Sequence, residues 1–316
     1  MIDNEFTLCK VLGKGGSSKV FLAQGLGGTK WAIKAIRKDI GINPEAAAMM
    51  LKREHSLLEL LSDHPNIIKS HRVNTQGQVW KDGKTESVIY AVLEFVKNGA
   101  LSNFVRYTGG VEESIARLFA IQIGSALQYM HQLGYAHMDV KLENILLDEY
   151  YNVKLADMGS SYYAFDTQGL INKKRGTLLY MAPEVLNFVE GKCYDVMAAD
   201  IYSFGVTLFV LISGEFPSSQ EIKSNLMTMD SENKNMVNAF MEDEKNTNSK
   251  PEILSKNLRN LVQLMTHSDP KKRPTIREVL DHAWFTSSIN DELLEEAYSE
   301  MNARKEFMLK LISKNM

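Results

Sequence analysis

The sequence predicts an α+β fold of two lobes: a small β-rich first lobe with one key helix and a larger, mainly helical second lobe. The chain has 316 residues, and at this length a single hydrophobic core rarely suffices. Short apolar runs separated by glycine turns dominate up to about residue 95, whereas helical spacing of apolar residues dominates after Lys97-Asn98-Gly99. We therefore expect domains at residues 1–96 and 97–285, and a helical tail at residues 286–316.

The composition is typical of a globular protein. It is 44% hydrophobic and 24% charged, which argues against a disordered or fibrous chain. A net charge of -3 gives no basic surface for nucleic acid or for an anionic membrane. Cys9 and Cys193 are too few and too far apart for a disulfide framework or a Cys-rich zinc site.

The chain shows no sign of export or membrane insertion. Its first residues are acidic and lack an apolar run, unlike a secretory signal. The longest apolar stretch, residues 205–212, is too short to span a bilayer. We therefore expect a cytoplasmic location, with the nucleus not excluded, and no membrane or nucleic-acid partner. Because the first strand is predicted near residue 6, we also expect no N-terminal regulatory domain.

The first lobe is predicted to contain short strands and hairpins. Residues 20–23 and 31–36 are predicted strands, and residues 25–29 form the turn between them. A later hairpin region ends in a predicted strand at residues 88–95.

A glycine-rich segment lies between the start of the chain and the first of these strands. Residues 12–20 read Leu-Gly-Lys-Gly-Gly-Ser-Ser-Lys-Val, and small residues let backbone amides approach anionic oxygens closely. A dinucleotide-binding fold would need a third glycine and a following helix, but Ser18 and a strand are present instead. A Walker loop would end in Gly-Lys-Ser or Gly-Lys-Thr, which is absent. A phosphate loop and a plain hairpin turn both remain open.

Lys34 and Glu54 are predicted to form an ion pair. Lys34 lies in a strand that is apolar on both faces, where a charge is costly unless it is paired or carried out to solvent by its stem. A helix is predicted from Asn43 as N-cap and Pro44 as first residue to about residue 62. Glu54 lies in the middle of the apolar stripe of this helix and needs a cationic partner. The stripe comprises Met50, Leu51, Leu57, Leu58 and Leu61.

The second lobe is predicted to be helical at residues 113–131 and again at residues 198–285, with a strand-loop block at residues 135–163 between them. Residues 218–250 are polar and rich in Asn, which indicates a surface insertion.

The tail is predicted to be an amphipathic helix with a weak turn near Arg304-Lys305. It is interpreted as a packing brace, a helix that docks on a partner, or an autoinhibitory segment, and these alternatives remain open.

Two loops of the strand-loop block carry candidate catalytic residues. One contains Asp139, Lys141 and Asn144, and the other contains Asp157. Carboxylate and amide oxygens suit Mg²⁺, so Asp139, Asn144 and Asp157 could supply one proton acceptor and two metal ligands. Lys141 could neutralise phosphate charge. A lone Asp in a loop usually only forms a turn. The occurrence of Asp139, Asn144 and Asp157 in this order after Lys34 and Glu54 indicates a catalytic role instead.

Three later segments, residues 176–184, 200–205 and 269–274, are interpreted as structural. Within them, Glu184 and Arg273 are predicted to form a long-range buried ion pair.

Taken together, residues 6–285 resemble the eukaryotic protein kinase family. The motifs occur in the order of that family: the glycine loop, Ala-Ile-Lys at Lys34, the helical Glu54, a His-x-Asp loop at Asp139, Asp-x-Gly at Asp157, Ala-Pro-Glu at Glu184 and the late Arg273. The resemblance implies a bilobal protein kinase-like fold, with ATP and Mg²⁺ as cofactors and protein Ser/Thr hydroxyls as acceptors.

The resemblance also implies roles for individual residues. Lys34 should hold the α- and β-phosphates while pairing with Glu54, and Asp139 should accept the proton of the substrate hydroxyl. Asn144 and Asp157 should bind Mg²⁺. Lys141 and Thr177 complete the implied catalytic set and are similar to the serine/threonine branch of the family.

A nucleotide-binding set follows from the same resemblance, with Leu93 as gatekeeper, a hinge after it, and apolar residues on both faces of the adenine. Its members are Leu12, Gly13, Gly15, Val20, Ala32, Lys34, Leu93, Glu94, Val96 and Leu146. The Lys-Leu-Glu-Asn form of the catalytic loop is similar to the calcium/calmodulin-dependent and AMP-activated-kinase-like groups.

The sequence departs from the family pattern at Ser18, Met138 and Met158, which replace a glycine, an arginine and a phenylalanine. In relatives, the arginine often pairs with a phosphorylated activation loop. Residues 172–175 carry no hydroxyl. We therefore predict activity that does not depend on activation-loop phosphorylation; alternatively, Lys173 or Arg175 replaces part of that charge network.

Two further expectations follow. Ala100 and Val210 replace acidic residues that basophilic relatives often carry, while Glu143 remains, so we expect at most a modest preference for basic substrates. The departures leave an alternative function, a pseudokinase that binds nucleotide and acts as a scaffold or regulator.

Overall fold

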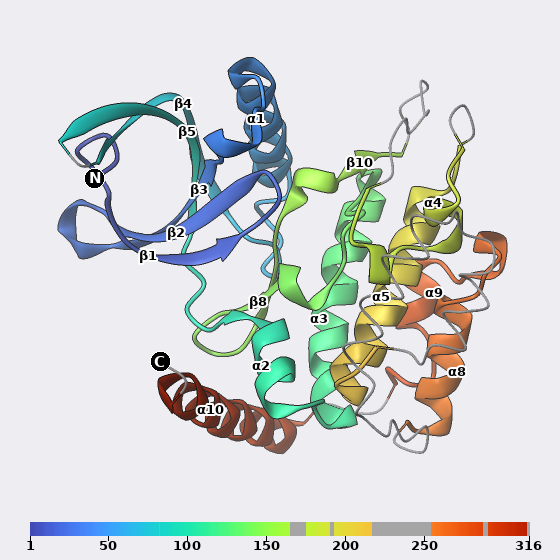
Figure 1. The fold of residues 1–316 in the computed structure, drawn as a ribbon. Helices are drawn as coiled ribbons and strands as arrows, with labels where there is room; N and C mark the ends of the chain where they lie inside the picture. Colours follow the sequence, from blue (N-terminus) through green and yellow to red (C-terminus); the bar gives the residue numbers. More distant parts are fainter. Residues whose placement is uncertain (82, 165–174, 190–192, 217–253, 287–289, 315–316) are drawn as a thin grey trace. The chain divides into compact units, whose positions relative to one another are not determined.

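The computed structural model describes residues 1–81, 83–164, 175–189, 193–216, 254–286 and 290–314. By internal contacts the chain divides into two units, each described here by itself. The first unit comprises Met1–Gly99, Leu147–Glu149 and Lys154–Gly159, and the second comprises Ala100–Leu146, Tyr150–Val153 and Ser160–Met316. The first is β-rich with one long helix and the second is mainly helical (Figure 1), which confirms the predicted α+β fold. The domain ranges predicted from the sequence stay predictions.

A five-stranded antiparallel sheet with the order β1-β2-β3-β5-β4 dominates the first unit. Its strands are β1 (Thr7–Lys14), β2 (Ser18–Gln24), β3 (Lys30–Ile36), β4 (Ser70–Lys81) and β5 (Lys84–Glu94). The register sets Ala32 opposite Leu93, and Lys34 opposite Val20 and Ala91. Directly opposed residues share a face of a sheet, so these five side chains lie on one side of it.

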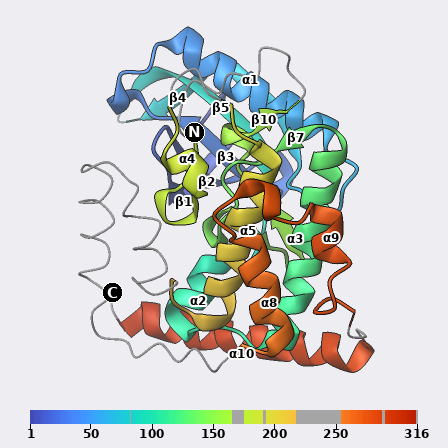
Figure 2. The same cartoon turned by 90° about the vertical axis from the view of Figure 1, so that its right-hand side faces the viewer.

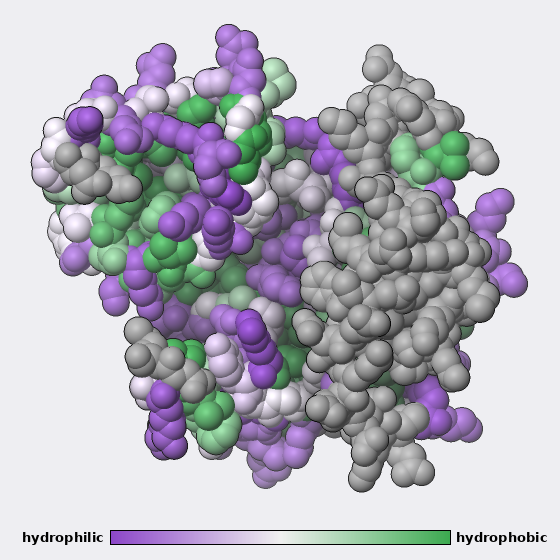
Figure 3. All heavy atoms as spheres, viewed as in Figure 1, coloured by the Kyte–Doolittle hydropathy of each residue, from purple (hydrophilic) through white to green (hydrophobic). Residues whose placement is uncertain are grey.

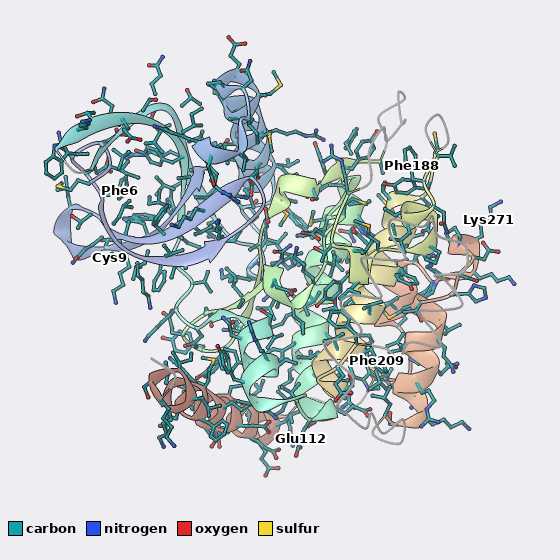
Figure 4. All side chains as sticks on the ribbon, in the orientation of Figure 1. Phe6, Cys9, Glu112, Phe188, Phe209 and Lys271 are labelled. Atoms are coloured by element: carbon teal, nitrogen blue, oxygen red, sulfur yellow. The ribbon has the colours of Figure 1, made fainter. Side chains whose placement is uncertain are left out.

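The other side of the sheet encloses a hydrophobic core. Ile33 and Tyr90 contribute from the strands, and Ile2 and Phe6 contribute from the start of the chain. Figure 4 shows Phe6 on the inner side of the curved strands. On the visible face of this unit, hydrophilic residues, drawn in purple, are interspersed with pale and hydrophobic ones (Figure 3). The sheet therefore has a sealed apolar side and a second side that carries Lys34.

Helix α1 (Pro44–Leu60) begins as the sequence predicts. The Asn43 side chain accepts a hydrogen bond from the backbone N–H of Glu45 at 2.8 Å, and Pro44 is the first helical residue. The buried stripe is Ala47, Leu51, Glu54, Leu57 and Leu58. Met50, which the periodicity assigned to this stripe, is 45% exposed, so that assignment was wrong. Ala47 and Leu51 fill the contact instead, and Met50 lies at the edge of the stripe.

The second unit is built around helices that pack along one another (Figure 2). The helices are α2 (Leu101–Thr108), α3 (Glu113–Gln132), α4 (Pro183–Leu186), α5 (Val196–Ser213), α8 (Lys256–Met265), α9 (Ile276–Leu280) and α10 (Asp291–Lys314). The remaining elements are distributed over both units. The short strands are β6 (Gly99–Ala100), β7 (Tyr135–Ala136), β8 (Ile145–Leu147), β9 (Val153–Leu155) and β10 (Tyr162–Tyr163). The short 3-10 turns are η1 (Leu26–Gly28), η2 (Lys38–Ile40), η3 (Leu142–Asn144), η4 (Met158–Ser160), η5 (Leu178–Tyr180) and η7 (Pro270–Lys272).

Helix α5 is the central helix of the second unit. The Asp195 side chain accepts from the N–H groups of Met197 and Ala198, and Gly214 ends the helix in a left-handed conformation. Among the described helices it is the one apolar and long enough to cross a membrane, but 78% of its 18 residues are buried, as is typical of a core helix. The longest apolar stretch in the sequence, residues 205–212, is shorter than the buried part of α5. The reason is that α5 also buries polar side chains, including those of Asp200 and Ser203, which interrupt the apolar pattern.

Helix α10 packs on the second unit without a break at Arg304, so the predicted weak turn is absent. It lies along α2 and α3 at one end of the helices (Figure 2). Ala297, Met301 and Met308 are buried on its inner side. Arg304 donates to Thr108 Oγ1 at 2.8 Å and to the carbonyls of Gly109 and Gly110 at 3.1 and 3.0 Å. Of the three interpretations of the tail, this packing supports the brace.

The predicted ion pair between Glu184 and Arg273 is confirmed. Two guanidinium nitrogens of Arg273 donate to the two carboxylate oxygens of Glu184 at 2.6 and 2.7 Å. Arg273 also donates to the carbonyls of Ala198 and His267. The buried guanidinium is therefore satisfied on several sides and ties α4, α5 and η7 together. The predicted insertion at residues 218–250 lies outside the described residues, as do residues 172–174 before Arg175 and residues 287–289 of the tail.

Candidate functional site

Lys34 is held by two carboxylates in the first unit. Its Nζ donates to both oxygens of Glu54 at 2.7 and 2.8 Å and to Oδ1 of Asp157 at 2.7 Å. Lys34 and Glu54 are buried. The predicted Lys34–Glu54 pair is confirmed, and Asp157 joins it from the segment after β9. The chain brings these three residues together because Lys34 is central in β3 and Glu54 faces inward from α1.

The electrostatics of this cluster favour a permanent cation. Burial lowers the pKa of Lys34, but the charges and hydrogen bonds of Glu54 and Asp157 outweigh burial and raise it well above its usual value. Burial raises the pKa of Glu54, Lys34 opposes this change, and the charge of Asp157 adds to it. Two carboxylates therefore share one ammonium, and the cluster has an excess of negative charge.

Asp157 is suited to a second, cationic partner. Its side chain is 48% exposed, and its backbone has a left-handed φ of 64°, which is uncommon for a residue other than glycine. Hard oxygen donors and excess negative charge are what Mg²⁺ prefers. Among the described residues, no group of three or more His, Cys, Asp or Glu side chains is placed to hold a metal ion by itself.

Asp139 is the centre of a second cluster, in the second unit. Its Oδ1 accepts from Thr177 Oγ1 at 2.8 Å, and its Oδ2 accepts from Lys141 Nζ at 2.7 Å and from Asn144 Nδ2 at 3.1 Å. Lys141 also donates to Thr177 Oγ1 at 2.5 Å. All four predicted residues of this unit are thus brought together around one carboxylate. Because Asn144 uses its amide nitrogen on Asp139, its amide oxygen is the atom suited to a metal ion.

Gly176 allows this cluster to form. Its φ is +103°, and a Cβ at this position would lie 2.6 Å from the carbonyl oxygen of Met138. Only glycine fits here, and this close approach brings Thr177 within reach of Asp139. The same residues line a small pocket, whose other walls include Tyr180 and Val185.

Asp200 positions the catalytic loop, a role that the sequence reasoning missed. This fully buried residue of α5 accepts from the backbone N–H groups of His137 and Met138, both at 2.7 Å, and lies 3.0 Å from His131 Nε2. Met138 has a left-handed φ of 65°, and these bonds hold it there. The signal in the sequence was an aspartate inside an otherwise apolar helix, because a buried carboxylate requires hydrogen-bond donors.

The predicted nucleotide-binding residues lie in both units. Val20, Ala32 and Leu93 share the sheet face of Lys34, and Ala32 and Leu93 are buried. Leu12 is exposed on β1. The remaining members have the following positions: Gly13 in β1, Gly15 in the loop after it, Glu94 at the end of β5, Val96 buried after β5, and Leu146 in β8 of the second unit. Their roles toward a nucleotide stay predictions.

Comparison with known proteins identifies the family of the chain. Residues 6–285 match the protein kinase domain family. A probable serine/threonine-protein kinase of Dictyostelium discoideum is 32% identical over 299 residues, which are 94% of this chain and 33% of that protein. CBL-interacting protein kinase 10 of Oryza sativa subsp. japonica is 32% identical over 92% of this chain and 59% of its own length. CBL-interacting serine/threonine-protein kinase 15 of Arabidopsis thaliana is 34% identical over 92% of this chain and 63% of its own length.

The chain thus spans between one third and less than two thirds of the length of these relatives. The matched range coincides with the range of the resemblance seen in the sequence. The chain belongs to the protein kinase family.

Proposed function

We propose that the chain is an ATP- and Mg²⁺-dependent protein kinase that transfers the γ-phosphoryl group to Ser and Thr hydroxyls of protein substrates. The observation that carries the proposal is the Asp139 carboxylate, which Lys141, Thr177 and Asn144 hold from three sides. A carboxylate fixed in this way is an acceptor that needs no reorganisation when a hydroxyl arrives. The names of the relatives support the serine/threonine class.

Each residue of the two clusters has a defined task in this reaction. Lys34, oriented by Glu54, binds the α- and β-phosphate oxygens of ATP. Asp139 orients the substrate hydroxyl and accepts its proton as the oxygen attacks the γ-phosphorus, while the bond from that phosphorus to the bridging oxygen breaks and ADP leaves. Lys141 places a positive charge beside the transferred phosphoryl group.

As the resemblance implies, the proposed ligands of a divalent cation are the carboxylate of Asp157 and the amide oxygen of Asn144, both of which are hard oxygen donors. When bound, Mg²⁺ neutralises charge on the phosphate oxygens. The residues keep their own tasks of binding, orientation and proton transfer.

The decisive experiment is phosphotransfer by the wild type and Asp139→Asn. Each is incubated with Mg-ATP and a generic protein substrate, and the added phosphate mass is measured. Loss of the proton acceptor is expected to lower the rate by about 10²- to 10⁴-fold. Asp281→Asn removes an exposed carboxylate of a surface pair and is the matched control. Unchanged turnover in Asp139→Asn would remove the assignment, and nucleotide binding without transfer in the wild type would favour the scaffold alternative.

We also propose that activity does not require a phosphate on the activation segment. Met138 is buried and apolar where relatives carry an arginine, and Arg175 donates instead to the carbonyl of Ser160 at 3.5 Å. Phosphatase treatment before the assay is expected to leave the rate unchanged. Inactivation together with loss of a phosphate between residues 160 and 177 would contradict this.

Two finer points belong to the same proposal. A peptide library is expected to show at most a modest preference for basic residues, since Glu143 is engaged by Tyr180 OH at 3.4 Å. A strong arginine requirement would oppose this. We propose a cytoplasmic location, for which cell fractionation is the test.

A further inference from the structure

Arg37 contacts the glycine-rich loop at three successive residues. Arg37 lies just after β3, and its NH1 donates to the carbonyl oxygens of Gly15 and Gly16, both at 3.1 Å. Its backbone N–H donates to the carbonyl oxygen of Ser17 at 2.9 Å. One residue thus binds the carbonyl groups of the whole turn between β1 and β2, and all of these residues belong to the first unit.

Asp39 fixes the direction of this guanidinium. Nε and NH2 of Arg37 donate to the two carboxylate oxygens of Asp39 at 3.0 and 2.6 Å. The planar fork of arginine matches a carboxylate on one edge, which leaves NH1 to point at the loop. The arginine side chain is only 19% exposed although its partner is on the surface. The hydrogen bond and charge of Arg37 lower the pKa of Asp39, so the pair is ionised near neutral pH.

The loop has little else to hold it in this conformation. A Cβ added at Gly13 or Gly16 would meet nothing within 4 Å, so no side chain packs against the tip there. The other contact within the turn is the bond from Gly15 N–H to the carbonyl of Ser18 at 2.9 Å. Without Arg37, a segment this rich in glycine would sample many conformations.

The arrangement also determines which loop groups remain for a ligand. The carbonyl groups of Gly15, Gly16 and Ser17 are directed at Arg37, and among the described residues none accepts from the N–H groups of Gly16 and Ser17. Backbone N–H groups that point away from an acceptor are ready to bind anionic oxygens. The carbonyl groups of the turn are thus bound by Arg37, while the N–H groups of Gly16 and Ser17 remain available to bind a ligand.

We propose that Arg37, oriented by Asp39, is a positioning residue that preorganises the glycine-rich loop for the phosphate groups of ATP. The inference rests on ATP being the ligand of the proposed function. A loop that is already ordered does not have to lose conformational freedom when the nucleotide binds, so its ordering raises affinity for the phosphates. The adenine is expected to contact Leu12 and Val20 at the ends of the glycine-rich segment, whereas Arg37 contacts only the turn at residues 15–17.

The test measures the Kd of the full chain for Mg-ATP and for adenosine, which lacks phosphates. Arg37→Met is expected to raise the Kd for Mg-ATP about tenfold, because bonds from a charged donor are lost, and to leave the Kd for adenosine within twofold. Lys38→Met is the matched control: the neighbouring cation has the same charge and is paired with Glu86 at 3.0 Å, but it has no contact with the loop. It is expected to bind both ligands like the wild type.

Two conservative variants separate geometry from charge. Arg37→Lys keeps the charge but cannot reach a carboxylate and two carbonyls in one fixed fork, so it is expected to lose most of the same affinity. Asp39→Asn keeps the arginine but loosens its direction, and an intermediate loss is expected. Wild-type binding by Arg37→Lys would overturn the proposed positioning role and leave only a charge effect.

The remaining outcomes are also decisive. An equal loss of adenosine and Mg-ATP binding in Arg37→Met would show a merely structural role, and unchanged Mg-ATP binding would show no role. Because the readout is binding, a wild type that binds Mg-ATP but transfers no phosphate would refute the proposed function without refuting the positioning role. A wild type that does not bind Mg-ATP would overturn both.

Discussion

At the scale of single residues, the sharing of Lys34 between two carboxylates determines what each carboxylate contributes. Glu54 is buried away from solvent, whereas the Asp157 side chain is half exposed. Burial alone would make either charge costly. The ammonium between them stabilises both, and it retains one partner when the other is removed.

This sharing predicts a separation of activity from stability in Glu54→Gln. Removing one partner of a buried ion pair usually costs about 3–5 kcal/mol, but here Asp157 stays 2.7 Å from Lys34. We expect a smaller loss in the free energy of unfolding, measured in urea, and a fall in kcat/KM of about 10²-fold because the ammonium is no longer aligned. Glu59→Gln, on the exposed side of the same helix, is the control. Equal kcat/KM in the two variants would refute the role of Glu54.

His64 predicts a pH dependence of the first unit. Burial, and then the charge of Lys154, lower the pKa of His64, and its Nδ1 accepts from the N–H of Asn66 at 3.2 Å. With the folded pKa below the unfolded value, the unfolded chain binds the proton more readily. Stability is therefore complete above the unfolded value of about 6.5 and is lost as pH falls toward the folded value.

We expect this loss to be less than about 1 kcal/mol, because His64 is only partly buried and solvent screens the interaction. Urea unfolding at pH 7.5 and at pH 5.5 measures it. His64→Asn retains an acceptor and removes the titration, so its dependence on pH should be smaller than that of the wild type. An equal dependence in the two proteins would assign the effect to other groups.

At the scale of elements, α10 is joined to the helical unit by polar contacts as well as by its apolar stripe. Arg304 donates to the segment that links α2 to α3, and Tyr151 OH donates to Asn302 Oδ1 at 2.7 Å. The ring of Tyr151 also meets those of Phe104 and Tyr298 edge-on. Such contacts fix the register of the helix, which burial of methionines alone would leave less defined.

Arg304→Ala tests the brace. The variant leaves the Thr108 hydroxyl and the carbonyl groups of Gly109 and Gly110 without this donor, and we expect a loss of about 1–3 kcal/mol in the free energy of unfolding with phosphotransfer at 25 °C unchanged. Lys310→Ala, at an exposed position of α10, serves as the control. If α10 were autoinhibitory, Arg304→Ala would instead raise the phosphotransfer rate without loss of stability.

At the scale of the whole molecule, the proposed function predicts stabilisation by nucleotide. A ligand at a concentration of 100 times its Kd stabilises the folded state by about 2.7 kcal/mol. We therefore expect Mg-ATP to raise Tm, and ATP with a chelator to raise it less because Asp157 then has no Mg²⁺ to bind. In Asp157→Asn the difference between these two conditions should disappear. Persistence of the difference would place the metal ion elsewhere.

The sequence predicted those contacts in which both partners are side chains that conflict with their surroundings. Lys34 and Glu54 are charges inside apolar patterns, so each pointed to a partner. The Glu184–Arg273 pair was predicted from the later segments as a structural pair, without such a pattern around Arg273. The contacts of Asp200 and Arg37 end on backbone atoms, which every residue possesses and no residue type marks. The predicted burial of Met50 was wrong because helical periodicity gives the centre of an apolar stripe but not its edges.

The bonds that Asp200 accepts from the loop before Asp139 have a consequence for how the proposed activity would be lost. The orientation of Asp139, the proposed proton acceptor, depends on a helix buried in the hydrophobic interior, in which Asp200 lies 61 positions further along the chain. A substitution that shifts this helix slightly would let Met138 leave its left-handed conformation. The Asp139 carboxylate would then be misaligned before any unfolding could be detected. Partial damage to the interior should therefore yield molecules that look intact by spectroscopy and have already lost their turnover.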